Sequence, residues 1–176
     1  TNKVTITITT LKDTALVEAF NLKAAVEFSM KNTEAAQEAL TDMPPRSEEE
    51  LDPVTLHNTA LINMDSDPTT GFKKLNFLLQ NPPFPPETFG NLLLLYCKPT
   101  YNFYDLAADV MAENSHLVQQ NLPQDVYDYL DGAILKQSSP EEAFRKFDEI
   151  ANKHVDVLRR LTSQEDLSSA EKTTLL

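Results

Sequence analysis

Catalysis and metal binding use histidine, cysteine and carboxylate side chains, and this sequence brings few of them together. His57, His116 and His154 are far apart, and no cysteine or carboxylate stands at metal-ligand spacing from them. Residues 65–67 read Asp-Ser-Asp, as a calcium loop begins, but the glycine comes one residue late and Asn76 replaces the bidentate glutamate. Neither a phosphate-cradling glycine loop nor a nucleophile elbow is present. We therefore expect a protein without catalytic residues, metal or cofactor.

The charge balance is strongly acidic, with 27 acidic and 15 basic residues and a net charge of −12. Such a surface repels phosphate backbones and anionic lipid headgroups, so we expect no nucleic-acid partner. Solubility explains the charge, and a basic partner is the alternative. Cys97 is the one cysteine, which excludes an internal disulfide and is typical of a reducing compartment. The apolar run 92–95 is too short to cross a bilayer, so we expect no membrane insertion.

The elements that position these residues are predicted to be helices. Three glycines are few, and the 11 prolines all fall at junctions between apolar segments. Asp52-Pro53 and Asp67-Pro68 each predict a helix start with an N-cap followed by proline, and Asn32 is a candidate cap for another helix. The proline-rich segment 82–86 predicts a stiff spacer, with a docking motif as the alternative.

A long-period repeat organises the helices. One unit has large and small residues at the spacing of the tetratricopeptide motif: Tyr127, Leu130, Asp131, Ile134, Ala143, Phe147 and Ile150. Asp131 occupies a position where the motif prefers a small residue. When the sequence is aligned with itself at an offset of 35 residues, Ala25 matches Ala60 and Ala36 matches Gly71. This offset is close to the period of about 34 residues of the tetratricopeptide repeat. A third copy fits at 92–111, with a longer connection at 98–103.

These observations predict an all-α tetratricopeptide-repeat superhelix, a right-handed α-solenoid fragment of eight helices in about four hairpins. The expected hairpins cover about 13–45, 47–83, 87–118 and 123–161 within a repeat region 12–162. Residues 1–11, with a strand-like alternation and no second strand to pair with, are expected to be a disordered or non-family leader. Residues 163–176 are a polar C-terminal tail. Because the sequence does not begin with Met and its last helix has no evident stop signal, we expect a piece of a longer chain.

Resemblance to tetratricopeptide proteins also implies a concave peptide-binding wall, formed by residues of the first helix of each hairpin. Members that clamp a C-terminal carboxylate have lysine or arginine there, whereas this sequence has mainly apolar residues and amides. The expected groove residues are Leu22, Val26, His57, Asn58, Leu61, Asn91, Leu94 and Tyr129.

Longer strings carry a closer resemblance. Residues 13–25, 34–45 (EAAQEALTDMPP), 48–58 (EEELDPVTLHN), 84–98 (FPPETFGNLLLLYCK) and 104–110 resemble the family of tetratricopeptide repeat protein 30, also called intraflagellar transport protein 70. The resemblance covers about 13–161 and departs around 98–103 and after Thr162.

The resemblance implies a non-enzymatic scaffold subunit of intraflagellar transport complex B at the cilium or flagellum and the ciliary base, on the cytoplasmic side. The family wraps a proline-rich segment of intraflagellar transport protein 52, contacts other complex B subunits and is linked to kinesin-2-driven anterograde transport. An apolar wall suits such a ligand, since a polyproline segment is already extended before it binds. Two alternatives remain: a general peptide-binding adaptor, and a regulator of tubulin polyglutamylation.

Overall fold

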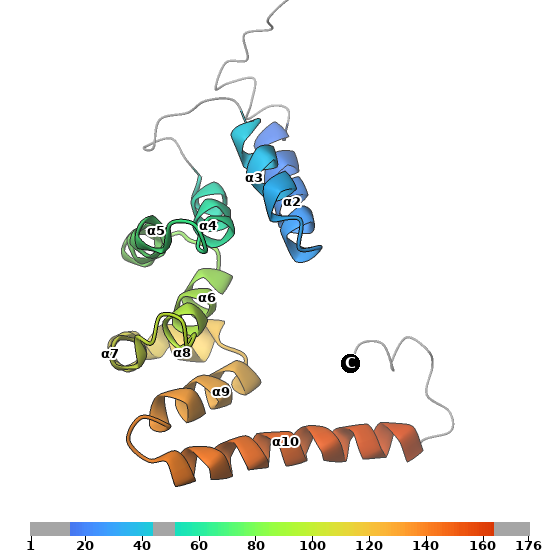
Figure 1. The fold of residues 1–176 in the computed structure, drawn as a ribbon, viewed down its shortest axis with the longest axis vertical. Helices are drawn as coiled ribbons and strands as arrows, with labels where there is room; N and C mark the ends of the chain where they lie inside the picture. The colour runs from blue at the N-terminus through green and yellow to red at the C-terminus, as the bar shows by residue number, and fades with distance from the viewer. Residues whose placement is uncertain (1–14, 44–51, 164–176) are drawn as a thin grey trace, which may run out of the picture. The chain divides into compact units, whose positions relative to one another are not determined.

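The computed structural model describes residues 15–43 and 52–163, and there the chain is helical (Figure 1). The leader, residues 44–51 and the polar tail after Ser163 lie outside the described residues. The described helices are α2 (Leu16–Ser29), α3 (Thr33–Thr41), α4 (Pro53–Ile62), α5 (Pro68–Gln80), α6 (Glu87–Tyr96), α7 (Tyr104–Glu113), α8 (Ser115–Asn121), α9 (Gln124–Leu135) and α10 (Pro140–Ser163). The predicted all-α, tetratricopeptide-like class is confirmed.

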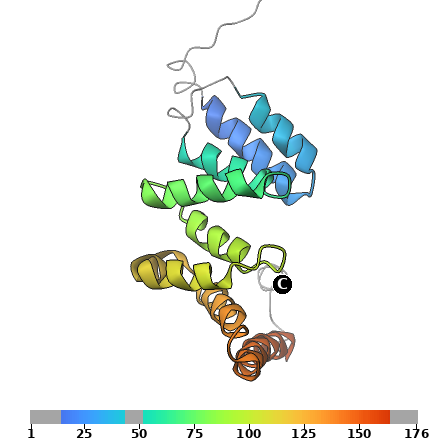
Figure 2. The ribbon, with the colours of Figure 1, turned by 60° about the vertical axis from the view of Figure 1, so that its left-hand side comes forward.

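The chain divides into two compact units, with Thr88 the last residue of unit 1 and Phe89 the first of unit 2. In unit 1, α2 packs beside α3 and α4 beside α5, while both α2 and α3 contact α4 (Figure 2). Ala24, Ala36 and Ala39 are completely buried against Ile62. Small side chains let α2 and α3 approach each other closely.

Unit 2 contains α7 to α10 and most of α6, and its strongest pairing is between α9 and α10, with α7 against α9. Its largest fully buried side chains are Phe89, Leu92, Leu93 and Leu130. The connection 97–103 is closed by a hydrogen bond from the Phe103 amide to the Tyr96 carbonyl (2.8 Å). The Tyr96 and Phe103 rings also meet edge to face, with centroids 6.1 Å apart.

The side chains predicted to cap helices make a capping hydrogen bond in two cases out of three. Asp52 and Asp67 each accept a hydrogen bond from a backbone amide of the first helical turn, at 2.9 and 3.1 Å, with proline at the first helical position. Asn32 occupies the N-cap position of α3 as predicted, but its side chain makes no cap hydrogen bond. Asn32 instead donates to the Glu27 carboxylate of the preceding helix (3.0 Å), because a charged acceptor lies within reach.

The prediction of eight helices misses α8. Asn114 leaves the helical region (φ −115°, ψ 42°) and its side chain donates to the Val110 carbonyl (2.9 Å), which ends α7 before α8 begins. A side chain that bonds its own backbone competes with helix continuation, which is why asparagine ends helices readily.

The close contacts between paired helices are shifted by one residue from the predicted register in two hairpins. In the first, Ala24 is buried whereas Ala25 is exposed. In the last, the small contact residue is Gly132 rather than Asp131, because a Cβ at Gly132 would lie 3.0 Å from the Phe147 ring. Asp131 lies at the edge of this contact and pairs with Lys146 of α10, whose pKa this hydrogen bond raises.

Candidate protein-binding surface

Three of the predicted groove residues present apolar surface on unit 1. Leu22 and Val26 lie one turn apart on α2 and are 66% and 45% exposed. Leu61 of α4 is half-buried. Another face of α2, which includes Asn21 and Ala24, packs on α3 and α4. Leu22 and Val26 are therefore apolar residues outside the packed face of this helix. Exposed apolar residues at helical spacing are a feature of surfaces that bind a partner.

His57, one of the predicted groove residues, is buried rather than exposed. It is 5% exposed, and its Nδ1 is 2.9 Å from the hydroxyl oxygen of the fully buried Thr88. Burial lowers the pKa of His57, and the opposing effect of the Glu87 carboxylate is smaller. A neutral imidazole bonded to a buried hydroxyl therefore ties α4 to the first turn of α6.

A chain of hydrogen bonds joins α2 to α4 next to His57. The Asn58 amide donates to Asn21 Oδ1 (2.9 Å), Asn21 Nδ2 donates to the Thr55 hydroxyl (2.8 Å), and that hydroxyl donates to the Asp52 carboxylate. Asn21 and Thr55 are both buried. Asn58 Nδ2 also donates to the Asn21 backbone carbonyl (3.5 Å), so this predicted groove residue directs its amide group into unit 1.

Asn21 and Thr55 are the important polar residues that the sequence analysis missed. The sequence did contain a signal for Asn21. This polar residue lies one helical turn before Ala24, on the side of α2 whose residues are buried. A polar residue among core positions requires a partner, and Thr55 is a hydroxyl donor and acceptor.

Unit 2 contains the other three predicted residues. Asn91 is half-buried and Leu94 is 37% exposed, both on α6. Tyr129 of α9 is 45% exposed, and its ring centroid lies 6.0 Å from that of Phe147 on α10. This contact holds the Tyr129 ring in place while leaving its outer edge accessible.

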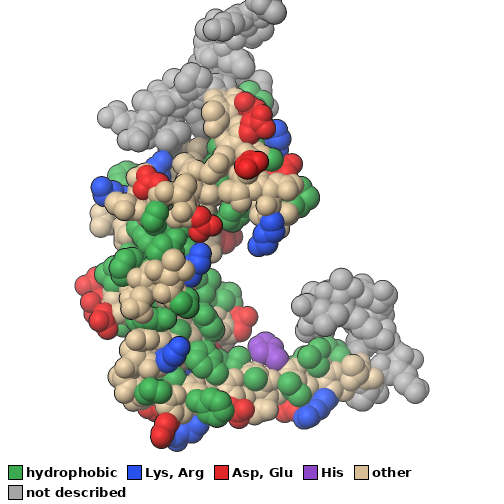
Figure 3. Space-filling model, in the orientation of Figure 1, with side chains coloured by type: hydrophobic (Ala, Val, Ile, Leu, Met, Phe, Trp, Pro, Cys, Tyr) green, Lys and Arg blue, Asp and Glu red, His purple; other side chains and the backbone are tan. Residues whose placement is uncertain are grey.

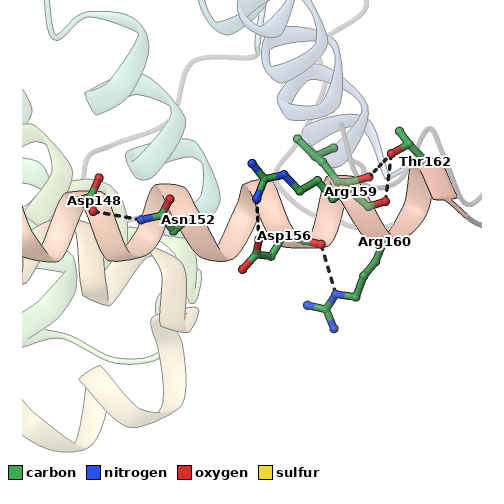
Figure 4. A network of polar contacts seen from close by, with 7 residues as sticks. Asp148, Asn152, Asp156, Arg159, Arg160 and Thr162 are labelled. Carbon is green, nitrogen blue, oxygen red and sulfur yellow. Dashed lines mark hydrogen bonds and ion pairs between the residues drawn. The ribbon is translucent and has the colours of Figure 1, made fainter.

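Helix α10 carries further apolar surface that the sequence analysis did not assign (Figure 3). Phe144 is 70% exposed, and Val155 and Leu158 are 38% and 40% exposed. Some polar residues of α10 bond along the helix itself, as Asn152 does with Asp148 and Arg159 with Asp156 (Figure 4). Such pairs, three or four residues apart, keep the polar side chains close to the surface of α10. Lys146 and Lys153 also pair with Asp131 and Asp128 of α9.

The described residues offer no group of three or more histidine, cysteine, aspartate or glutamate side chains that could hold a metal ion. Cys97 is buried, which raises the pKa of its thiol to about 11, so the nucleophilic thiolate is scarce at neutral pH. Among the described helices, none combines the length and apolarity that crossing a membrane requires.

Paired helices with closely packed small residues and exposed apolar side chains define a protein of the tetratricopeptide-like helical-repeat class. Sequence comparison then specifies the family. The model of the intraflagellar transport protein 70 C-terminal domain matches residues 88–174. The chain belongs to the intraflagellar transport protein 70 family, and the resemblance found in the sequence is confirmed.

Curated relatives extend the match to both units. The chain is 67% identical over 154 residues to intraflagellar transport protein 70A of Xenopus tropicalis and to 70B of Homo sapiens, and 66% identical to 70B of Mus musculus. Each match covers 88% of this chain and 23% of the relative. The chain therefore spans about a quarter of the length of these relatives.

Proposed function

We propose that this chain is part of a non-enzymatic scaffold subunit of intraflagellar transport complex B. The observation that carries the proposal is the 67% identity to proteins named for intraflagellar transport, which extends over 88% of the chain. The proposed setting is the cilium or flagellum and its base, on the cytoplasmic side. Other complex B subunits and kinesin-2 are the proposed wider partners.

The proposed ligand is a proline-rich segment of intraflagellar transport protein 52. The apolar positions on each unit support this assignment, since Leu22 and Val26 on unit 1 and Leu94 and Tyr129 on unit 2 are exposed and uncharged. A polyproline segment loses little conformational entropy on binding and presents rings that pack on aliphatic and aromatic side chains. The hydrogen-bond chain between α2 and α4 supports a rigid α2 face, which lowers the entropy cost of binding.

Fluorescence anisotropy with a labelled peptide of this proline-rich segment tests the proposal. Leu22→Asp and Leu94→Asp place a charge on each predicted face, and both residues are exposed enough for the fold to tolerate the change. We expect each variant to weaken binding about tenfold or more, because a buried carboxylate without a partner opposes apolar contact. Phe144→Asp, which changes a 70% exposed residue of α10 outside the predicted groove, is the matched control.

The result also separates the proposal from a general peptide adaptor. A scrambled peptide of the same composition should bind at least tenfold more weakly than the native order. Equal binding of both peptides would favour an unselective adaptor. Absence of saturable binding by well-folded chain would refute the claim that these residues suffice for the interaction.

A further inference from the structure

An open hollow of about 610 Å³ lies in unit 2, and none of the predicted groove residues lines it. It is formed by the last turn of α7, by α8 and by the start of α9. Its lining residues are Met111, Ala112, Ser115, Val118, Gln119, Leu122, Gln124 and Tyr127. The chain leaves the helical conformation at Asn114, so the segment 104–121 forms two short helices, α7 and α8, instead of one continuous helix. The hollow lies where these two helices meet. Its volume falls in the range of sites that bind a small ligand or a few side chains.

The lining is apolar with uncharged polar groups. Met111, Val118 and Leu122 are half-buried and provide aliphatic surface. Ser115, Gln119 and Gln124 provide hydroxyl and amide groups that suit a peptide backbone. No lysine, arginine, aspartate or glutamate is among the residues that line it. The hollow itself therefore fits an apolar side chain on a peptide, and any recognition of charge takes place at its rim.

The rim is acidic. Between Lys98 and Lys136 the sequence contains six aspartates and glutamates but no lysine or arginine. Asp128 and Asp131 are paired with lysines of α10. The remaining four are exposed and form no ion pair with another described residue: Asp105, Asp109, Glu113 and Asp125.

The position of these four carboxylates connects them to the hollow. Asp105, Asp109 and Glu113 recur every four residues along α7, and Ala112, which lines the hollow, lies on the same side of the helix as Asp109. Asp125 follows Gln124, which also lines the hollow. Negative charge thus occurs at both the α7 and the α9 ends of an uncharged depression, and no nearby cation of these helices neutralises it.

We propose that this hollow is a second docking site, for a basic peptide segment that inserts one large apolar side chain and places lysine or arginine against the α7 carboxylates. Charge complementarity selects this occupant, because an acidic or neutral segment would lose the attraction at the rim. The site differs from the proposed groove for a proline-rich segment in residues and in chemistry, so the two can be tested separately.

The probe is a fluorescein-labelled peptide with one leucine flanked by three lysines on each side, titrated into the full chain and followed by anisotropy. Two control peptides replace the leucine by serine or the lysines by glutamine. We expect saturable binding of the first peptide only, weakened about fivefold or more when salt rises from about 50 to about 300 mM, because exposed charge pairs are screened.

Two variants locate the site. Asp109→Lys with Glu113→Lys reverses the rim charge and should weaken binding about tenfold or more. Ala112→Phe fills the hollow from an exposed position that tolerates a larger side chain, and it should weaken binding without changing the charge. The matched control is Glu34→Lys with Glu38→Lys, an exposed pair with the same spacing on α3 of unit 1. Circular dichroism establishes that each variant remains helical.

Three results would overturn the proposal. Equal weakening by the α3 control would show attraction to net charge alone. Equal binding of the serine peptide, or no binding of the leucine peptide, would show that the hollow accepts no apolar side chain from a basic segment. Concentration-dependent self-association that Ala112→Phe abolishes, measured by sedimentation equilibrium without peptide, would assign the hollow to a second copy of this chain.

Discussion

At the scale of single residues, buried polar side chains specify how α4 is held. Asn21 is 4% exposed and takes part in two side-chain hydrogen bonds, one to Thr55 and one from Asn58. A buried polar group that loses its partner retains the full cost of leaving water, about 1–3 kcal/mol. These bonds therefore favour one register of α2 against α4.

Replacing Asn21 tests this role. Asn21→Ala removes both bonds and should lower the free energy of unfolding by about 1–3 kcal/mol in urea titrations. Asn152→Ala is the control, because Asn152 is exposed and bonds only to Asp148 of its own helix. The control should change stability by less than about 0.5 kcal/mol. A similar loss in both variants would contradict the role given to Asn21.

His57 makes the stability of unit 1 sensitive to acid. Its pKa in the folded chain is below the ordinary value of 6.5, because burial disfavours the charged ring. Below about pH 6.5 the unfolded chain binds a proton at this residue that the folded chain resists, so stability falls as pH falls through the unfolded pKa. The unfolding free energy should therefore decrease less between about pH 7.5 and 5.5 in His57→Gln than in the unmodified chain. His154→Gln, at an exposed position of α10, controls for the loss of a histidine.

At the scale of elements, helix starts depend on whether the capping side chain reaches the backbone. Asp67 accepts hydrogen bonds from the first turn of α5, which lowers the pKa of its carboxyl. Asn32 occupies the equivalent position before α3 but bonds to Glu27 instead. Residue type alone does not distinguish these two cases.

The comparison of the two caps gives a direct test. Asp67→Ala should lower the free energy of unfolding more than Asn32→Ala does, because it removes the N-cap hydrogen bond to the first turn of α5. Asn32→Ala should lower it by less than about 0.5 kcal/mol, since it removes only an exposed side-chain pair. Thermal unfolding followed by circular dichroism measures both. A larger loss for Asn32→Ala would show that Asn32 caps α3 in solution.

At the scale of the whole molecule, contacts are concentrated within two units. Gly71 illustrates this for unit 1, where a Cβ would lie 2.7 Å from the Met64 methyl carbon and 3.2 Å from the Ala60 carbonyl oxygen. The methionine side chain can move, but the backbone oxygen of α4 cannot move without shifting the helix. Glycine is thus needed here for the close approach of α5 to α4.

Gly71→Val should therefore destabilise unit 1, by about 1–3 kcal/mol from overpacking. Hydrogen exchange should show faster exchange of amides in α4 and α5, while the amides of α9 and α10 retain their protection, because the neighbours of Gly71 all belong to unit 1. Gly90→Ala provides a milder comparison, since its Cβ would meet only the flexible Leu122 side chain at 3.3 Å. Uniform loss of protection along the chain would contradict this division.

Much of the architecture followed from local sequence. Aspartate before proline predicted the starts of α4 and α5, because capping depends on neighbouring residues. The motif strings indicated the family, which the relatives confirm. These features require no knowledge of distant contacts.

Tertiary structure decided what the repeat pattern left open. Whether Asp131 or Gly132 meets the neighbouring helix depends on the rotation of α9 about its axis, and a one-residue error changes that rotation by about 100°. Likewise, the burial of His57 depends on Thr88, 31 residues away, and the partners of Asn21 are 34 and 37 residues away. The sequence by itself determined which segments are helical and which family they belong to. Only the tertiary structure decided which side of each helix is buried, because that choice minimises buried, unpaired polar groups over contacts between segments that are distant in sequence.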